Sequence, residues 1–332
     1  MKRYLLKNYY PVYKIGPFID IGIVGSAKFL QIDYCEQNIR LVRRALSEGF
    51  TKEEIMLRVE LAELLEKGLI GEFQTYSTLS ISERHANFFE FLGIEWKDLE
   101  EFKEKKILIF GSGAAGATIT YLLAQFGYRR IFVVDSDIVE MSDINKTLIF
   151  RQPDIKRIKV SALRHCIEQN FGFNIEDIAL SPNTLIEISD IIENVAPDLV
   201  IKACDPDLSF RYHLNQICFD KMIPFVHMSY SFERLNIGPF FVPGLTKSDN
   251  VIDHNFTMMC GKEYTFHNHK KLFSDLLCHP STSFNINILA AIILKEIIFF
   301  HLNRYEYVFS LNREVYFFPL SMKVLYRSLD DL

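Results

Sequence analysis

Closely spaced cysteine pairs are missing from this sequence. Its six cysteines are scattered over 332 residues, and nowhere do two of them form a Cys-x-x-Cys motif. Because such pairs are the usual ligands of a structural zinc ion, we expect no structural zinc site. The cysteines also lack the rhythm of a disulfide framework, and the chain opens without a signal-peptide pattern. These absences predict a protein of the reducing cytoplasm.

An excess of positive charge and a long uninterrupted apolar run are missing too. The formal net charge is −5 at pH 7, which gives no general argument for binding nucleic acid. The most apolar run, Ile286–Phe300, is broken by Lys295 and Glu296 and is short for a bilayer span, so it predicts a buried helix. We therefore expect neither a nucleic acid nor a membrane as partner. Hydrophobic residues make up 49% of the chain, which at this length can supply the cores of two domains.

A glycine-rich turn is the most informative feature that is present. The apolar stretch Ile107–Phe110 predicts a strand, and it leads directly into Gly111, Gly113 and Gly116 in G-x-G-x-x-G spacing. Glycines in this pattern allow a tight turn and a close approach of a phosphate to the backbone. The N-terminus of the helix that follows attracts the negative charge of that phosphate.

A carboxylate follows the next predicted strand. The stretch Ile131–Val134 ends in Asp135, nineteen residues after the last glycine of the motif. A carboxylate in this position accepts hydrogen bonds from a ribose, so the pattern predicts a Rossmann-like nucleotide site. The strand, the glycine turn and the carboxylate fit a dinucleotide as well as ATP, and the residues after Asp135 distinguish the two.

The segment Asp135–Lys146 reads D-S-D-I-V-E-M-S-D-I-N-K and resembles the ThiF-type adenylating domain. That family includes ubiquitin-activating enzymes and the bacterial enzymes of thiamin, molybdopterin and microcin C7 biosynthesis. Its members read roughly D-x-D-x-V-x-x-S-N-L-x-R-Q here, followed later by a lysine. The resemblance covers about residues 106–300, including the MIPFVHMSY stretch and the turn Val242-Pro243-Gly244. It implies an α/β, Rossmann-like adenylating domain over residues 105–332, with ATP and Mg²⁺ as cofactors.

The resemblance also implies roles for single residues, besides the glycines and the ribose-binding carboxylate. Asn145 and Lys146 take the places of a polar residue and of the family's phosphate-binding arginine. Lys159 matches the later lysine. Asp205, after the strand Leu199–Ala203, matches the aspartate that binds magnesium and the nucleotide.

Two positions depart from the family pattern. Asp143 replaces the usual asparagine, and Lys146 replaces the usual arginine. Lysine keeps the positive charge but lacks the bidentate fork of arginine, which weakens the expected phosphate contact.

Residues 1–73 are expected to form a separate unit. Strands are predicted over Tyr10–Gly25 and Ala27–Asp33, where glycines punctuate apolar stretches. Apolar residues at helical spacing predict a helix that ends at Gly49, and Thr51 with Glu54 forms a capping box for the next helix. The remaining signals are the helix positions Ile39, Val42, Leu46, Leu61, Leu64 and Leu65, the terminating Gly68, and a possible strand at Leu69–Phe73.

This winged-helix-like α+β plan resembles the peptide-recognition element of enzymes that modify ribosomally made peptides. The resemblance implies that a leader peptide binds as an added strand along a sheet edge. Arg40, Arg43 and Arg44 on the first predicted helix would suit an acidic peptide. A winged helix also suggests DNA, but the next helix is acidic, which disfavours that alternative. A unit that only packs on the adenylating domain or builds a dimer is the third interpretation.

Residues 74–104 are expected to link the two domains, and Arg84 is the only arginine among them. The family has an arginine just before the nucleotide domain that reaches the phosphates bound by the partner subunit. Giving Arg84 this role implies a homodimer, in which Ile286–Phe300 would suit a large buried interface. An exposed helix arginine with no such role is the alternative.

A weaker candidate site lies further along the chain. Cys260 falls where relatives carry a loop across the active site, and it could be a nucleophilic thiolate or an ordinary loop or core cysteine. The surrounding residues could hold a metal, although their spacing is more typical of loop polarity. The candidates are His254, Cys260, His267, His269, Cys278 and His279.

Together these resemblances imply an enzyme that activates a carboxylate of a precursor peptide as an acyl adenylate and releases pyrophosphate. No general base is needed, because a carboxylate is already a nucleophile at neutral pH. The nearest members serve microcin C7 and pantocin A biosynthesis. The missing zinc cysteines and the shorter C-terminal part favour the pantocin type, in which activation of acidic side chains leads to ring closure. The alternatives are a sulfur-carrier adenylyltransferase, an NAD-dependent oxidoreductase and a non-catalytic nucleotide-binding protein.

Overall fold

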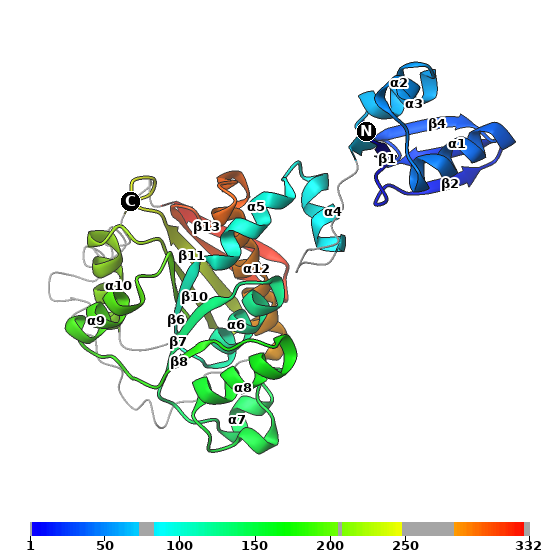
Figure 1. Ribbon diagram of the computed structural model, residues 1–332. Coiled ribbons are helices and arrows are strands. Elements are labelled where there is room, and N and C mark those ends of the chain that lie inside the picture. Colours follow the sequence, from blue (N-terminus) through cyan, green and yellow to red (C-terminus); the bar gives the residue numbers. More distant parts are fainter. Residues whose placement is uncertain (1, 73–82, 205–207, 248–281, 329–332) are drawn as a thin grey trace. The chain divides into compact units, whose positions relative to one another are not determined.

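The computed structural model describes residues 2–72, 83–204, 208–247 and 282–328. The chain divides into two compact units, Met1–Gly93 and Ile94–Leu332 (Figure 1). Both units mix helices and strands, and the predicted α/β fold class is confirmed.

The first unit contains two small antiparallel sheets in its described part. One sheet pairs the first strand of the unit with the last, and the other has the order β2-β3-β4. The elements are β1 (Tyr4–Leu6), β2 (Val12–Ile15), β3 (Phe18–Gly22), β4 (Phe29–Asp33), α1 (Glu36–Ser47), α2 (Lys52–Met56), α3 (Val59–Glu66), β5 (Ile70–Glu72) and α4 (Glu83–Phe91).

A hydrophobic core joins the three-stranded sheet of this unit to its helices. Side chains of β4 alternate, with Leu30 and Ile32 buried and Gln31 exposed, as expected for a strand with one face on a core. From the other side, α3 contributes Leu61 and Leu64, which are fully buried. The unit therefore has its own core, which is the property of a separate domain.

Most of the predicted elements of the first unit are present, with two corrections. The predicted strand Tyr10–Gly25 is a hairpin of β2 and β3 that turns at Gly16, whose φ is +58°. Leu46 is 42% exposed and not part of the buried face, because the buried stripe of α1 includes Leu41 and Ala45. Val42 is buried as predicted and Ile39 packs against the core, so only the last of the three predicted positions lies off the buried face.

Local contacts fix the ends of two helices in this unit. The predicted capping box is confirmed: the Glu54 amide donates to Thr51 Oγ1 at 3.2 Å, and the Thr51 amide donates to Glu54 Oε2 at 2.9 Å. Helix α4 packs within the same unit, where Lys7 pairs with Glu90 at 2.9 Å. These contacts tie the segment after β5 to the first strands of the chain.

The second unit is a layered α/β structure around one large sheet. In the described part of the chain this sheet has the order β13-β12-β11-β10-β9-β6-β7-β8, parallel from β10 to β8 and antiparallel from β10 to β13. Its strands are β6 (Lys106–Phe110), β7 (Arg130–Val134), β8 (Glu176–Ile178), β9 (Leu199–Lys202), β10 (Phe225–Ser231), β11 (Arg234–Phe241), β12 (Arg313–Phe318) and β13 (Lys323–Ser328).

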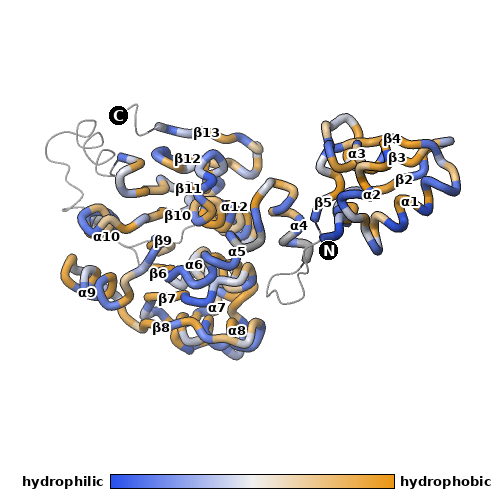
Figure 2. Tube along the Cα trace, turned by 45° about the horizontal axis from the view of Figure 1, so that its top comes forward, coloured by the Kyte–Doolittle hydropathy of each residue, from blue (hydrophilic) through white to orange (hydrophobic). Residues whose placement is uncertain are grey.

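Helices cover both faces of this sheet. In Figure 1, α6, α8 and α12 lie on one face, and α9 and α10 lie on the other. The helices of the unit are α5 (Trp96–Glu101), α6 (Ala114–Phe126), α7 (Met141–Ile144), α8 (Lys159–Phe171), α9 (Leu185–Val195), α10 (Leu208–Asp220) and α12 (Ser283–His301). Parallel strands covered on both faces read as continuous apolar runs, as in β6 and β9, which are orange in Figure 2.

The most apolar run of the chain is a core helix of this unit. Helix α12 is long and apolar enough to cross a membrane, but 56% of its apolar window is buried inside the structure. It packs on α6 and on β10 and β11, with Ile286, Leu289 and Ile293 fully buried. The prediction of a buried helix is confirmed. The buried part of this run is covered by its own unit, and the predicted dimer interface stays a prediction.

Candidate nucleotide site

The carboxyl ends of three parallel strands meet at one edge of the large sheet. Strand β6 has β7 on one side and β9 on the other, so the direction of strand succession reverses at β6. Backbone hydrogen bonds continue past the strand ends: the Gly111 amide donates to Val134 O at 2.9 Å, and the Ala203 amide donates to Phe110 O at 2.9 Å. In open α/β sheets this switch point forms the crevice in which ligands bind.

Packing within the protein explains two of the three glycines. A Cβ atom on Gly111 would lie 2.7 Å from the backbone nitrogen of Cys204, and Gly111 has a φ of +103°. A Cβ atom on Gly116 would lie 1.9 Å from Gly111 O. The turn and the close contact between helix and strand therefore exclude side chains at these two positions.

Packing does not explain the middle glycine. Gly113 is the N-cap of α6 with an ordinary φ of −63°, and a Cβ atom built there meets no atom within 4 Å. The space above Gly113 is open, at the N-terminus of a helix whose first amide groups are available to an anion. In the G-x-G-x-x-G pattern, a glycine at this position lets a phosphate approach the backbone closely.

Asp135 is held in place by hydrogen bonds from two backbone segments. Its Oδ2 accepts from the Ser112 amide at 2.6 Å and from Ser112 Oγ at 3.0 Å, and its Oδ1 accepts from the Asp137 amide at 2.8 Å. The carboxylate is half-buried beside the glycine turn. Each carboxylate oxygen has further lone pairs, so Asp135 can still accept hydrogen bonds from a ribose.

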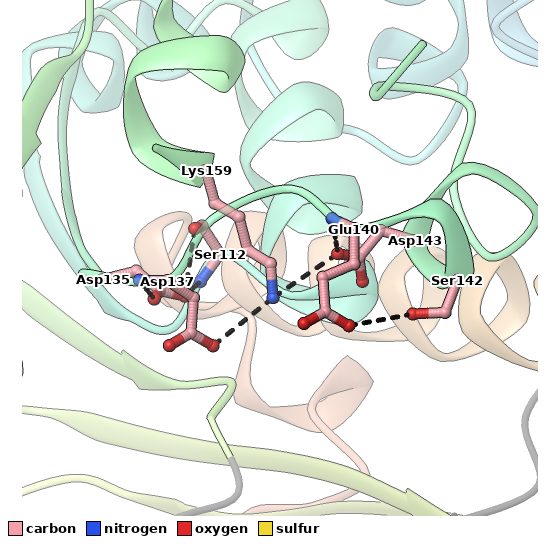
Figure 3. Close-up of polar contacts among 7 residues, drawn as sticks. All are labelled: Ser112, Asp135, Asp137, Glu140, Ser142, Asp143 and Lys159. Carbon is pink, nitrogen blue, oxygen red and sulfur yellow. Dashed lines mark hydrogen bonds and ion pairs between the residues drawn. The ribbon is translucent and has the colours of Figure 1, made fainter. Parts of the chain in front are cut away.

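Lys159 lies between two carboxylates at the first position of α8. Its Nζ is 3.4 Å from Asp137 Oδ2 and 3.6 Å from Asp143 Oδ2, and the side chain is only 11% exposed (Figure 3). Burial opposes the charge of this ammonium, but Asp143, Asp137 and Asp135 outweigh burial, and the pKa of Lys159 is raised above its ordinary value. The group is therefore a fixed cation at this edge of the sheet.

Asp143, one of the two departures from the family pattern, has a structural role. Its Oδ2 accepts from the Glu140 amide at 3.0 Å, which caps the short helix α7, and the same oxygen faces Lys159. An asparagine could accept the same amide hydrogen bond but would bring no charge to Lys159. The departure therefore adds a negative charge beside the predicted phosphate-binding lysine.

Asn145 and Lys146 follow α7 directly. The Lys146 amide donates to Asp143 O at 3.0 Å, so the backbone of this turn ties Lys146 to the residue that faces Lys159. Asn145 is exposed and Lys146 is half-buried. Within the described ranges the Lys146 ammonium has no carboxylate partner, whereas Lys159 has two.

The remaining predicted site residues lie beyond what the structure describes. Asp205 falls outside the described residues, as do Cys260 and the histidines and cysteine grouped with it. Arg84 lies on α4, but its side chain is not described. The roles predicted for all of these residues stay predictions.

Two buried polar residues near the same sheet edge were missed by the sequence reasoning. Lys202, at the end of β9, is 5% exposed and donates to Cys204 O at 2.7 Å. His227 is its register partner on β10, and burial, followed by the charges of Lys202 and Arg211, holds the pKa of His227 well below its ordinary value. The signal was available: each is a polar residue inside an apolar strand, where a buried polar group needs a partner or a function.

Comparison with known proteins gives the family of the chain. A sequence model described as the ThiF family matches residues 83–292, which is more than half of the chain. The SAMP-activating enzyme E1 of Haloferax volcanii is 30% identical over 131 residues, which cover 39% of this chain and 47% of that relative. The chain spans about half or less of the length of the first curated relatives that it matches.

Two solved structures share the fold. A structure of E. coli MccB with AMPCPP and MccA has a TM-score of 0.73 and 18% identity, and the likeness covers 99% of this chain and 97% of that chain. A structure of PaaA has a TM-score of 0.65 and 18% identity, over 87% of this chain and 95% of that chain. The first likeness includes the N-terminal unit as well as the α/β unit.

Proposed function

This chain belongs to the ThiF family, and we propose that it uses ATP to activate a carboxylate of a ribosomally made precursor peptide. The product is an acyl adenylate, with pyrophosphate as the leaving group. Its N-terminal unit captures the leader of that peptide. In the pantocin-type version of this proposal, the activated group is an acidic side chain and the peptide closes a ring.

The open cradle at Gly113 is the observation that carries the nucleotide part of the proposal. Gly111 and Gly116 are needed by the protein's own packing, but Gly113 has free space above it at a helix N-terminus. A phosphate group fits this combination of open space and amide donors. Asp135, held by Ser112, is positioned at the neighbouring strand end to bind the ribose.

The cations near this edge supply the charge that a triphosphate requires. Lys159 is fixed between two carboxylates, and Lys146 has no carboxylate partner among the described residues. Bound ATP supplies an electrophilic phosphorus and a leaving group, and these lysines neutralise the negative charge around them. The activated carboxylate acts as nucleophile without a base. We assign the magnesium to Asp205, and this assignment rests on the family pattern alone.

A free sheet edge in the first unit supports the peptide part of the proposal. Strand β2 is an edge of the three-stranded sheet, and Tyr13, Lys14 and Ile15 on it are exposed. Such an edge presents backbone groups that an extended peptide can pair with as an added strand, and the strand β4 forms the other edge. The likeness to MccB structures that contain MccA also favours a peptide partner.

Substitution of Gly113 tests the nucleotide site without disturbing the fold. In Gly113→Ala the new Cβ atom meets no protein atom within 4 Å, so the melting temperature should change little beyond the small penalty for alanine as an N-cap. The affinity for ATP with Mg²⁺, measured by calorimetry, should fall at least about tenfold, because a charge-assisted phosphate contact is lost. NAD is the control ligand. Unchanged ATP affinity in Gly113→Ala, or tight binding of NAD alone, would refute the proposal.

A homodimer with shared sites is the remaining part of the proposal. If Arg84 reaches the phosphates bound by a partner subunit, Arg84→Ala and Asp205→Ala should each abolish peptide-dependent pyrophosphate release. Mixed dimers of these two variants should regain one working site out of two. Confirmed mixed dimers with no recovery would show that Arg84 acts within its own subunit or has no role.

A further inference from the structure

The first unit also contains a basic pocket. It has a volume of about 410 Å³ and is lined by residues of α1, among them Glu36 and Gln37, by Phe50 after α1 and by Arg58 between α2 and α3. We call it the arginine pocket and define it by Arg40, Arg44, Arg58, Leu41 and Phe50. Three guanidinium groups around one cavity are an arrangement that favours an anion.

The centre of the arginine pocket is rigidly built. Phe50 is 4% exposed, and the guanidinium of Arg44 lies 4.4 Å from the centroid of its ring. Arg44 Nη2 donates to Glu54 Oε1 at 2.6 Å, and Glu54 is itself fixed by the capping box with Thr51. Stacking and this hydrogen bond use one face and one edge of the guanidinium, so other N–H groups of Arg44 remain for a ligand.

Arg58 brings a second cation to the pocket from a different helix. It is the N-cap residue of α3, and its guanidinium, which can only donate hydrogen bonds, cannot cap the amides of that helix. In the part of the chain that the structure describes, Arg58 has no carboxylate partner, whereas Arg40 pairs with Glu36 and Arg44 pairs with Glu54. No described residue of the unit therefore neutralises the charge of Arg58.

We propose that the arginine pocket binds an acidic side chain of the precursor peptide. This inference rests on the proposed function and deepens it, because it gives the leader a required chemistry: an aspartate or glutamate that anchors to Arg58 and Arg44. A planar guanidinium binds a carboxylate with two parallel hydrogen bonds, which gives direction as well as strength. The pocket is large enough for one such residue and its neighbours in the peptide.

A single carboxylate suits this pocket better than the backbone of a nucleic acid. Glu36, Glu48 and Glu54 lie beside the arginines, with Glu48 3.9 Å from Arg44. Nucleic-acid binding draws on several phosphates spread along a basic surface, and these carboxylates would repel such a strand. Glu36 lines the pocket together with the arginines, and a single carboxylate that pairs with Arg58 faces fewer carboxylates than a strand of phosphates does.

Selection of peptides on the full-length protein tests the proposal. Random peptides displayed on phage are selected on the wild type, on Arg44→Gln/Arg58→Gln and on Arg43→Gln. Arg43 is the matched control, because it is an exposed arginine of α1 that does not line the pocket. Circular dichroism checks that each variant is folded. We expect an acidic residue at a fixed position in the peptides selected by the wild type and the control, and its loss with the double variant.

A synthetic peptide from the wild-type selection then gives the affinity by fluorescence anisotropy. The double variant should bind it about tenfold or more weakly, and Arg43→Gln should bind it as the wild type does. Replacing the fixed acidic residue of the peptide by its amide should weaken binding to the wild-type protein as much as the double variant does. This second measurement needs no change in the protein. The same replacement in the peptide should not weaken its binding to the double variant any further, because the peptide change and the protein change remove the same contact.

The outcomes separate this inference from the proposed function. Selected peptides without a fixed acidic residue, or with one that the double variant still selects, would overturn the arginine pocket and leave peptide capture intact. If the wild type selects no peptide at all, the peptide part of the proposed function fails as well. A fluorescent 20-base-pair DNA duplex that binds the wild type and not the double variant would assign the pocket to nucleic acid and also overturn the inference.

Discussion

The nucleotide site of the second unit and the arginine pocket of the first are built from different parts of the chain. The nucleotide site is made mainly of backbone at the ends of buried strands, and its cation Lys159 is 11% exposed. The arginine pocket is made of long side chains on short helices, and the Arg40 side chain is 77% exposed. Both favour an anion, but only the first depends on how the main chain is packed.

This difference separates the effects of substitutions in the two regions. A change at a backbone-built site alters the packing of strands and helices, so binding and stability are lost together unless the position faces open space. A change at a site built from exposed side chains removes binding and leaves the fold intact. The following substitutions test that distinction, from the largest expected effect to the smallest.

Gly116→Ala should have the largest effect. Its Cβ atom would lie 1.9 Å from Gly111 O, and main-chain atoms of a strand end cannot yield as a flexible side chain can. We expect a loss of about 3 kcal/mol or more in the free energy of unfolding, from overpacking at a close contact between helix and strand. Chemical denaturation of Gly116→Ala and Gly113→Ala under the same conditions measures the contrast. Equal stabilities for the two variants would show that the glycine turn is not packed as described.

Lys159→Ala should have the second-largest effect, a loss of catalytic rate. The lysine is a fixed cation beside the open glycine cradle, so its loss removes one preorganised charge from the phosphates. We expect peptide-dependent pyrophosphate release to slow by about 10²- to 10³-fold. The far-ultraviolet circular dichroism should remain that of the wild type. A rate near that of the wild type would remove Lys159 from the site.

These two predictions also show how much the sequence could reveal. The glycine turn and Asp135 were predictable, because a backbone-built site requires particular residues at fixed spacing along one stretch of chain. The partners of Lys159 were not, because Asp137 and Asp143 are distant from it in sequence. Backbone pairing between the segment before α7 and the start of α8 brings them together, with the Lys159 amide donating to Asp137 O at 2.8 Å. A departure that reads as a defect in the motif, Asp143, is a capping and pairing residue in the structure.

The arginine pocket shows the same limit more clearly. The sequence reasoning grouped Arg40, Arg43 and Arg44, because they lie close together on one helix. The structure keeps Arg40 and Arg44, leaves Arg43 outside the pocket and adds Arg58 from the start of another helix. A site assembled from side chains of separate elements leaves no spacing in the sequence, because the distances depend on the tertiary fold.

Asp143→Asn should have two smaller effects in opposite directions: tighter ATP binding and lower stability of the fold. Asparagine can still cap α7, so the variant loses mainly the charge beside Lys159. Removing that negative charge should tighten ATP binding roughly fivefold, which corresponds to about 1 kcal/mol of Coulomb energy near a protein surface. Calorimetry measures this affinity. Weaker ATP binding in Asp143→Asn would mean that the carboxylate positions Lys159 for the phosphates and does not compete with them.

The same variant should lose stability in a way that depends on pH. The pKa of Lys159 is raised in the folded state, so its pairing stabilises the fold fully below its ordinary value of 10.5 and is lost as the pH rises through the raised value. The wild type should therefore be more stable than Asp143→Asn at pH 8, and the difference should shrink above pH 10.5. Urea denaturation of both proteins at pH 8 and pH 11 measures the difference. A constant difference would show that Lys159 does not titrate against Asp143.

Arg58→Gln should have the smallest effect of all on the fold and on ATP. Its side chain has no carboxylate partner among the described residues, so its removal breaks no ion pair there. Surface substitutions of this kind change the free energy of unfolding by less than about 0.5 kcal/mol. ATP affinity by calorimetry should equal that of the wild type, since Arg58 belongs to the first unit and the glycine cradle to the second. Weaker binding of a selected peptide with unchanged stability and ATP affinity is the pattern expected of a site built from side chains. A parallel fall in ATP affinity would instead show that the two regions are energetically coupled, and the contrast between them would have to be abandoned.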